Sequence, residues 1–388
     1  MQKSLHAKDN RAARKLREST QADLPFLILI LLLLGMGLTM LYSASSAQSL
    51  YDTRYESSVR YFARQAVCAL LGLCAMYGFS RIPVSFWYRT AWLQYGISIV
   101  LLLGVLVFGQ KVNGARRWIS IAGLRFQPSE TAKFTMILVL ARLTRRMGEK
   151  AQTFRFGVLG FGAALMGILL PLAAEKHLSA ILLMGMVAVV MMFVAGTRVR
   201  WLLGGAAAAG IFVLVYISFM GYAGDRVSAW LHPEQDPGDT GYQILQSLYA
   251  IGSGGVFGFG FLKSRQKYLY LPFQYNDYIF PVICEELGFF GAICILALFS
   301  ALIVRGYWIA LRAADRFSSV LAAGIVTLIA LQAILNFCVV TNMLPSTGIS
   351  LPFFSYGGTA LAVNLAEMGL VLQISRSRST GKLQEEDI

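Results

Sequence analysis

The stretch YIFPVICEELGFFGAICILALFSALIV, residues 278–304, decides the fold class of this chain. It is longer than the roughly 20 apolar residues that an α-helix needs to cross the hydrocarbon core of a bilayer. Its only charged side chains are the neighbouring Glu285 and Glu286. The stretch therefore predicts a membrane-spanning helix that carries two carboxylates.

Comparable apolar runs recur along the whole chain. Its 388 residues are 56% hydrophobic and 14% charged, with a mean hydropathy of +0.60, which is more apolar than a water-soluble protein. We expect an all-α, polytopic membrane protein with about ten transmembrane helices, because irregular backbone cannot face lipid. The expected spans are Pro25 to Tyr42, Gln65 to Phe79, Trp92 to Phe108, Thr131 to Leu140, Phe156 to Leu172, Leu178 to Ala195, Trp201 to Phe219, Tyr278 to Val304, Val320 to Val340 and Thr359 to Leu372.

The distribution of Lys and Arg predicts the orientation of these helices. Segments that are cytoplasmic when the N-terminus is inside carry more Lys and Arg than the segments on the other side. This bias places both termini in the cytoplasm. The expected organisation is a basic N-terminal tail (1–23), a transmembrane domain (24–375) and a C-terminal tail (376–388). The topology explains the formal net charge of +14, and we expect no nucleic-acid partner.

The same topology places three unusual segments outside the cytoplasm: Gly109 to Glu130, Met220 to Asp277 and Thr341 to Tyr356. The second of these is a large loop between the seventh and eighth helices. The three segments hold most of the Gly, Pro, Asn and Asp residues that interrupt the apolar pattern, and many polar residues that are not simple connectors. We therefore expect function to lie on the outer face of the membrane.

Asp277 lies where the large outer loop leads into the apolar helix that contains Glu285. One interpretation is that Asn276 or Asp277 caps this helix, which is worth about 0.3–1 kcal/mol at a helix N-terminus. The alternative is a functional carboxylate at the outer mouth of the helix. Local sequence leaves both interpretations open.

Glu130 and Lys133 lie three residues apart at the start of the fourth span, so they share one helical face and can pair. Ionisable groups inside a membrane span face a protein cavity and often mark a substrate path. A structural pair near the interface, with Lys133 extending to water, is the alternative.

Arg116 and Arg117 stand beside Trp118 in the first outer segment. Two guanidinium groups at the bilayer surface can bind a pyrophosphate head group, or bulk anionic lipid. The glycine-rich stretch 252–260 is not a nucleotide loop, because it follows no strand and lacks the Gly-Lys-Ser/Thr ending. Its glycines instead favour close packing of backbone.

Seven motifs occur in order along the chain: NGARRW (113–118), FQPSETAK (126–133), GSGG (252–255), SRQKYLYLP (264–272), NDYIF (276–280), EELGFFGA (285–292) and LPFFSYGG (351–358). Together they resemble the SEDS family of FtsW, RodA and SpoVE proteins, over nearly the whole chain from about residue 42 to residue 358. The combination of SRQKYLYLP with YND is closer to the FtsW cell-division branch than to the RodA elongation branch.

The resemblance implies a ten-helix fold and a peptidoglycan glycosyltransferase that polymerises lipid II and works with a class B penicillin-binding protein. It implies that Asp277 is the essential aspartate and that Glu130 and Lys133 form a pair in the substrate cavity. We expect Lys267 and Glu285 in the same cavity, and we expect other division-complex membrane proteins as partners.

Three departures from the family pattern limit this transfer. The usual Glu-Pro-Asp-Leu-Gly-Thr reads EKHLSA at 175–180, so the aspartate of that motif is absent. The usual Leu-Pro-Glu reads LPF at 271–273, and the usual Pro-Thr-Lys-Gly reads PSTG at 345–348. A phosphate contact made by the missing lysine must come from elsewhere.

The expected mechanism needs no nucleotide. Asp277 accepts the proton of the acceptor hydroxyl as that hydroxyl attacks the anomeric carbon of a prenyl-pyrophosphate donor. Arg116, Arg117 and Lys267 offset the charge of the departing pyrophosphate, a role that a divalent cation (Mg²⁺ or Mn²⁺, with Asp277 as one ligand) can also fill. No other cofactor is expected. The expected location is the cytoplasmic (inner) membrane, at the division septum.

Two other functions remain open from the sequence. A lipid II flippase would use the same intramembrane charges to line a translocation path, but transport needs a route to both faces, and the distinctive residues are on the outer side. A non-catalytic division scaffold would leave the pattern of Asp277 and Glu130 unexplained.

Overall fold

The computed structural model describes residues 22–51, 59–112, 115–121, 124–205, 207, 210, 222–235 and 240–377. The predicted tails lie almost wholly outside these residues, so the domain boundaries stay a prediction. In chain order the elements are α2 (Leu24–Tyr51), α3 (Arg60–Phe79), α4 (Val84–Phe108), β1 (Gln110–Val112), β2 (Ala115–Ile121), β3 (Leu124–Phe126), α5 (Pro128–Met147), η1 (Gly148–Gln152), η2 (Phe154–Gly160), α6 (Phe161–Ala174), α7 (Leu178–Val194), α9 (Tyr222–Leu231), η3 (Pro233–Gln235), α10 (Thr240–Ser253), α11 (Ile279–Leu311), α12 (Arg316–Val340) and α13 (Thr359–Ser377).

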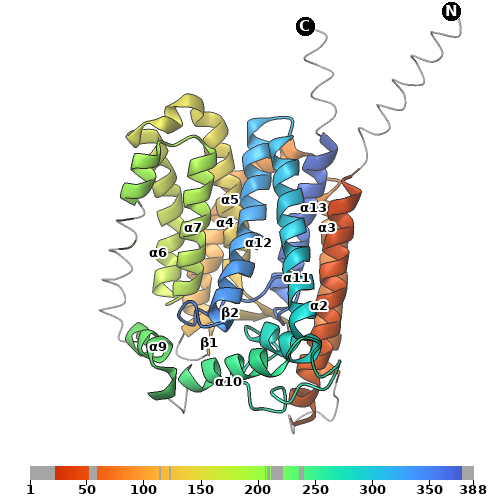
Figure 1. Cartoon of the computed structure of the whole chain (residues 1–388). Helices are drawn as coiled ribbons and strands as arrows, with labels where there is room; N and C mark the ends of the chain where they lie inside the picture. The colour runs from red at the N-terminus through yellow and green to blue at the C-terminus, as the bar shows by residue number, and fades with distance from the viewer. Residues whose placement is uncertain are drawn as a thin grey trace, which may run out of the picture.

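The long helices run side by side as one bundle with two distinct ends (Figure 1). At one end, here called the tail end, the backbone N–H of Asp23 donates to Ser375 Oγ at 3.0 Å, so the start of α2 meets the end of α13. At the opposite end, called the loop end, α9 and α10 lie across the bundle beside the small sheet (Figure 1). The segments that were predicted to lie outside the cytoplasm thus share one end. Which side of a membrane this end faces stays a prediction.

The described helices coincide with nine of the ten predicted runs, and the seventh, Trp201 to Phe219, lies largely outside the described residues. By length and composition, six described helices can cross a membrane, and α7 is a shorter apolar helix. A predominantly helical, polytopic membrane fold is therefore confirmed. The number ten stays a prediction.

Two helices, α5 and α12, form the inside of the bundle. In α12, 78% of the most apolar window is buried within the protein, against 28% in α3 and in α4. α5 is buried along nearly its whole length, from Pro128 to Thr144. Because α5 contacts protein rather than lipid, it can carry charged side chains that a lipid-facing helix could not.

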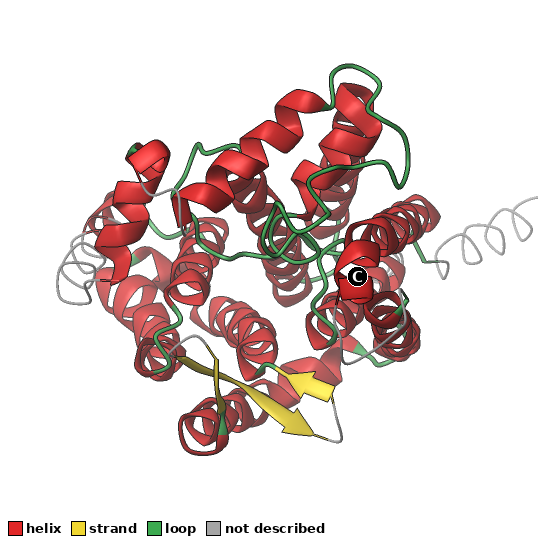
Figure 2. Cartoon of the chain, turned by 90° about the horizontal axis from the view of Figure 1, so that it is seen from below, coloured by secondary structure: helices red, strands yellow, loops and turns green. Residues whose placement is uncertain are grey.

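The first predicted outer segment contains strands, which the sequence analysis did not anticipate. Its three strands form an antiparallel sheet in the order β1-β2-β3, in which Gln110 pairs with Trp118 and Ile119 with Phe126. The sheet lies at the edge of the loop end, beside the helices that precede and follow it (Figure 2). Strands are possible here because their edge groups lie beyond the hydrocarbon core. The all-α class describes the bundle, and the sheet is a small addition.

α11 is interrupted at Gly288, whose backbone angles are φ 67° and ψ −164°. The glycine-rich loop satisfies the backbone groups that the interruption exposes. The N–H groups of Phe259 and Gly260 donate to the carbonyl oxygens of Glu285 and Glu286, at 3.0 and 2.9 Å. In return, the Phe289 N–H donates to the Gly255 carbonyl at 2.9 Å. The glycines of residues 252–260 do pack backbone closely, as predicted, and they complete a broken membrane helix.

We predict that Gly258→Ala destabilises the protein. Gly258 has φ +73°, and an added Cβ would lie 2.2 Å from the carbonyl oxygen of Glu286. Strain of roughly 1–3 kcal/mol, plus loss of the docking bonds, should lower the melting temperature of detergent-solubilised protein. The matched control is Gly252→Ala, because an added Cβ there meets no atom within 4 Å. Equal melting temperatures for the two variants would contradict the assigned docking.

Candidate active site at the loop end

Asp277 lies half-buried where α11, α12 and the segment 341–358 meet. The side chain of Asn336, on α12, donates from Nδ2 to the backbone carbonyls of Asp277 and Ile349, at 2.7 and 2.8 Å. A Cβ added to Gly348 would lie 3.3 Å from Asp277 Oδ2, so the glycine makes room for the carboxylate. The N-cap position of α11 is Tyr278 rather than Asn276 or Asp277. The structure therefore does not place Asn276 or Asp277 at the N-cap of α11, and the functional role of Asp277 stays a prediction.

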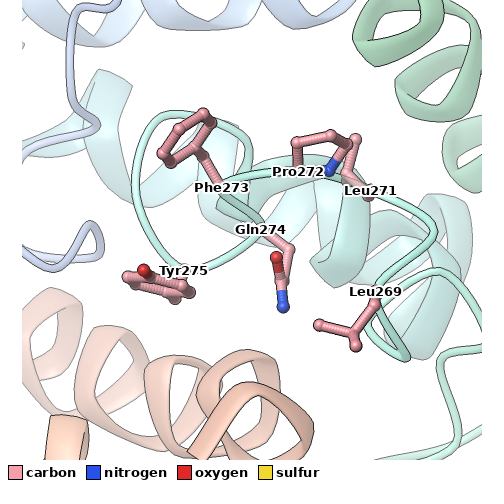
Figure 3. A pocket seen from close by; sticks show the side chains of 6 residues that line it. All are labelled: Leu269, Leu271, Pro272, Phe273, Gln274 and Tyr275. Carbon is pink, nitrogen blue, oxygen red and sulfur yellow. The ribbon is translucent and has the colours of Figure 1, made fainter. Parts of the chain in front are cut away.

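A pocket of about 250 Å³ lies in the segment just before Asp277. Its lining residues are Leu269, Leu271, Pro272, Phe273, Gln274 and Tyr275 (Figure 3). The Tyr275 ring lies 4.7 Å from the ring of Tyr61 on α3, measured between centroids. The backbone N–H of Tyr356 donates to the Tyr275 carbonyl at 2.9 Å. The pocket combines apolar and aromatic side chains with one amide, a mixture typical of small-ligand sites.

Two buried carboxylates of α11 hold the segment 264–267 in place. Glu285 accepts hydrogen bonds from Ser264 Oγ at 2.5 Å and from the backbone N–H groups of Arg265 and Gln266, at 3.0 and 3.2 Å. Glu286 accepts from Ser43 Oγ on α2, at 2.6 and 2.7 Å to its two oxygens, and pairs with Lys267 Nζ at 3.1 Å. The five side chains Ser43, Ser264, Lys267, Glu285 and Glu286 are buried. We call them the anchor network.

The anchor network gives Lys267 and Glu285 a role that differs from the one predicted from sequence. Both residues are only 1% exposed. The ammonium of Lys267 is already compensated by Glu286, and the carboxylate of Glu285 is occupied by the turn that follows Ser264. Contact of either residue with substrate stays an untested prediction. In the structure they position the loop that leads to Asp277.

Glu130 and Lys133 form the ion pair that their spacing predicts. Lys133 Nζ lies 2.8 Å from Glu130 Oε2, and both side chains are buried on the inner helix α5. Ser129 precedes Glu130 on α5, and Glu367 lies on α13, which packs against α5. Both side chains are buried, and neither has a hydrogen-bond partner among the described residues. The pair lies in a buried polar cluster within the bundle, here called the chamber, and Lys133 does not extend to water. Its place in a substrate cavity stays a prediction.

The guanidinium groups of Arg116 and Arg117 do not lie side by side. They are neighbours on β2, so their side chains leave the strand on opposite faces. Arg116 is exposed, and its Nη1 donates to the Leu106 carbonyl at 2.8 Å. Arg117 is half-buried and donates to the Lys176 carbonyl in the turn between α6 and α7. Of the two, Arg116 has the exposure that a phosphate contact needs.

The α6–α7 turn contains two titratable groups that sequence reasoning did not single out. Burial raises the pKa of Glu175 to about 8, although the positive charge of Arg117 opposes this shift. Burial, reinforced by the charges of Arg117 and Lys133, lowers the pKa of His177 to about 3. Ser179 Oγ donates to the Thr347 carbonyl, so this turn also contacts the segment beside Asp277. The turn thus connects the surroundings of Asp277 with those of Lys133.

Among the described residues, no group of three or more His, Cys, Asp or Glu side chains is arranged to hold a metal ion. The fold and site together define a class of protein. It is a helical membrane protein with a carboxylate-bearing site at one end of the bundle and a charged chamber beneath it.

The chain belongs to the FtsW/RodA/SpoVE family. The family profile, described as a cell cycle protein, matches residues 24–380. A relative from Trichlorobacter lovleyi named "Probable peptidoglycan glycosyltransferase FtsW" is 38% identical, over 96% of this chain and 98% of its own length. Stage V sporulation protein E of Bacillus subtilis is 39% identical, over 92% of this chain and 98% of its own.

Solved structures show the same fold. A chain of a peptidoglycan synthase complex, from a study of coordinated polymerisation and crosslinking, is 29% identical with a TM-score of 0.77, covering 92% of this chain and 98% of its own. The rod shape determining protein RodA of Thermus thermophilus is 27% identical with a TM-score of 0.68, covering 92% of this chain and 97% of its own.

We predict a specific change in the pH dependence of stability for Glu175→Gln. The folded pKa of about 8 exceeds the ordinary value of 4.5, so the folded state retains a proton that the unfolded state has released. Stability contributed by this group therefore falls as pH rises from about 4.5 to about 8. The variant should lose this slope and melt at a higher temperature than the wild type at pH 8.

Thermal unfolding between pH 5 and pH 8.5 measures this effect. The contribution of His177 is common to both proteins and cancels in the comparison. Glu234→Gln, an exposed replacement at the same end of the bundle, is the control and should keep the wild-type slope. A wild-type slope in Glu175→Gln would show that the carboxyl is not held in this environment.

Proposed function

We propose that this chain is a peptidoglycan glycosyltransferase that polymerises lipid II into glycan strands at the outer face of the cytoplasmic membrane. The observation that carries the proposal is the position of Asp277. Its carboxylate lies half-buried at the loop end, next to a pocket. The segment that carries it accepts a hydrogen bond from the Asn336 side chain of α12 and another from the backbone N–H of Tyr356. The names of the FtsW relatives support the same activity.

Asp277 acts as the general base in this proposal. The acceptor sugar hydroxyl loses its proton to the Asp277 carboxylate while its oxygen attacks the anomeric carbon of the donor. The bond between that carbon and the pyrophosphate breaks, and undecaprenyl pyrophosphate leaves with the bonding electron pair. Attack opposite the leaving group inverts the anomeric centre. The donor is already activated, so no nucleotide is needed.

Positive charge near the departing pyrophosphate lowers the energy of the transition state. Arg116 is an exposed guanidinium at this end of the bundle, and Lys133 offers a buried ammonium on α5. Within the described ranges, no group of three His, Cys, Asp or Glu side chains surrounds Asp277 in a way that could hold a divalent cation. Mg²⁺ or Mn²⁺ would therefore be held mainly by pyrophosphate oxygens and water, with Asp277 as the carboxylate in reach.

We place the protein in the cytoplasmic membrane at the division septum, with a class B penicillin-binding protein and other division-complex membrane proteins as partners. The support is the FtsW name of several relatives and the solved peptidoglycan synthase complex, in which polymerisation and crosslinking are coordinated. A membrane-embedded polymerase that releases strands at the outer face needs a crosslinking enzyme at the same face.

We predict that Asp277→Asn abolishes strand formation. The experiment compares polymerisation of labelled lipid II by wild type and variant, each purified with its cognate class B penicillin-binding protein in equal folded amounts. An amide cannot accept the acceptor proton, so the rate should fall by at least about 10²-fold, a typical contribution of general-base catalysis.

Asp315→Asn is the matched control. Asp315 caps α12 at the tail end, and Asn serves equally well at an N-cap, so this variant should keep the wild-type rate. If Asp277→Asn makes strands at the wild-type rate, Asp277 is not the base. If, in addition, labelled lipid II crosses vesicles that contain either protein, the lipid II flippase becomes the better function.

A further inference from the structure

A basic and aromatic surface lies at the tail end of the bundle, away from the candidate active site. It is formed by the connection between α5 and α6, which contains η1 and η2, and by the residues that follow α7 (Figure 1). The ring of Phe154 in η2 lies 5.0 Å from the ring of Trp201, measured between centroids. Two segments far apart in sequence therefore meet in one surface.

Three cations of this surface lie over its aromatic rings. The Nζ of Lys150 and the Cζ of Arg155 each lie 5.9 Å from the centre of the Phe156 ring. The Cζ of Arg200 lies 4.9 Å from the centre of the Trp201 ring. Cation–π contacts of this kind orient a positive group without neutralising it. The three cations are exposed, and the rings leave their charge uncompensated.

The positive charge of the surface exceeds its negative charge. Arg198, which is also exposed, is a fourth cation, whereas Glu149 is the one carboxylate in residues 148–155 and 195–201. Within the described residues, none of the four cations forms an ion pair. We call the four cations and the three rings the tail-end patch, and its members are Lys150, Phe154, Arg155, Phe156, Arg198, Arg200 and Trp201.

The backbone of the α5–α6 connection is fixed by its own hydrogen bonds. The N–H and the Oγ1 of Thr153 donate to the Lys150 carbonyl at 3.0 and 2.7 Å, and the Gly157 N–H donates to the Thr153 carbonyl at 2.7 Å. Only glycine fits at residue 157, because an added Cβ would overlap the carbonyl oxygen of Ala151. No side chain caps the helix that begins at Phe154, so its positive N-terminal end adds to the charge of the patch. A connection fixed in this way pays little ordering entropy when it binds a ligand.

The patch includes and adjoins apolar side chains that face outward. Phe154 and Phe156 are 46% and 40% exposed, and Leu159, further along η2, is 55% exposed. In a polytopic membrane protein, exposed apolar side chains near a helix end contact lipid, with aromatic rings near the head-group level. Lys and Arg side chains beside them extend from the apolar layer toward the head groups. The patch therefore combines a surface suited to lipid with uncompensated positive charge.

We propose that the tail-end patch binds the head group of an anionic phospholipid. Guanidinium groups pair with phosphate oxygens through two parallel hydrogen bonds. An anionic head group, such as that of phosphatidylglycerol, supplies this phosphate and carries no positive charge. A zwitterionic head group also carries an ammonium group, which the four cations repel. This site lies at the opposite end of the bundle from Asp277 and is independent of the proposed function.

The first test removes the three arginines of the patch together, in a variant with Arg155→Gln, Arg198→Gln and Arg200→Gln. Native mass spectrometry of the detergent-solubilised full chain measures its affinity for short-chain phosphatidylglycerol. We expect the affinity to fall about 10²-fold, because each cation beside anionic lipid contributes a factor of about five. Lysine at the same three positions keeps the charge and should retain most of the binding.

The matched control replaces three other exposed arginines of the tail end with glutamine, namely Arg81, Arg89 and Arg312. The net charge changes by the same amount, so this variant should keep an affinity near that of the wild type. Phosphatidylcholine and soluble glycerol phosphate complete the comparison. At the same concentration, both should bind the wild type much more weakly than phosphatidylglycerol does.

The second test uses the fluorescence of Trp201. Lipids that carry bromine on their acyl chains quench an indole that they contact. When brominated phosphatidylglycerol is added, the wild type should lose more fluorescence than Trp201→Phe. The difference between the two proteins should be smaller with brominated phosphatidylcholine.

Equal losses of affinity in the patch variant and in the control would overturn the proposal, because net charge alone would then explain the binding. Equal affinity for glycerol phosphate would also overturn it, since the patch would then recognise a free phosphate rather than a lipid. So would a contribution of Trp201 to quenching that is the same for both brominated lipids. None of these measurements uses polymerisation, so a wild type that makes no strands contradicts only the proposed function.

Discussion

The buried ion pair between Lys267 and Glu286 is the constraint on which the loop end depends. An isolated charge inside a membrane bundle costs several kcal/mol, so each partner requires the other. Around this pair, Glu285 binds the turn after Ser264, and Ser43 brings in α2. The break at Gly288 lets the glycine-rich loop enter the helix that carries both carboxylates. Together these contacts turn a long outer segment into a defined support for Asp277.

The buried polar groups of this protein fall into two sets that differ in how fully they are hydrogen-bonded. The anchor network is internally paired: Lys267 Nζ donates to Glu286, and the backbone N–H groups of Ser264 and Arg265 donate to Glu286 and Glu285, which suits a positioning role. The chamber on α5 and α13 is unsaturated, because Glu367 and Gln332 have acceptors without partners in the described residues. A saturated network stabilises a shape, whereas an unsaturated one is able to bind a polar group.

Much of the fold could be predicted from the sequence, because apolar runs and charged loops follow directly from the bilayer. The pairing of Glu130 with Lys133 follows from their spacing. The role of Lys267 does not follow from the sequence, because its partner Glu286 lies 19 residues further along the chain, on another element. The strands around Arg116 and Arg117 were missed because the motif was interpreted only as two guanidinium groups beside Trp118 at the bilayer surface, without a secondary structure. Glu367 was visible as a carboxylate in the last apolar run, and an ionisable group in such a run often faces a protein cavity, so it could have been singled out from the sequence.

The most direct test of the whole account is a structure of the protein bound to a lipid II donor analogue. In this analogue a carbon atom replaces the oxygen that joins the anomeric carbon to the pyrophosphate, so the donor cannot react. The account predicts that the anomeric carbon lies beside the Asp277 carboxylate at the loop end, with the pyrophosphate near Arg116 and the chamber of Lys133. A head group bound at the tail end, or in a passage that joins both ends and avoids Asp277, would contradict it and would favour transport over polymerisation.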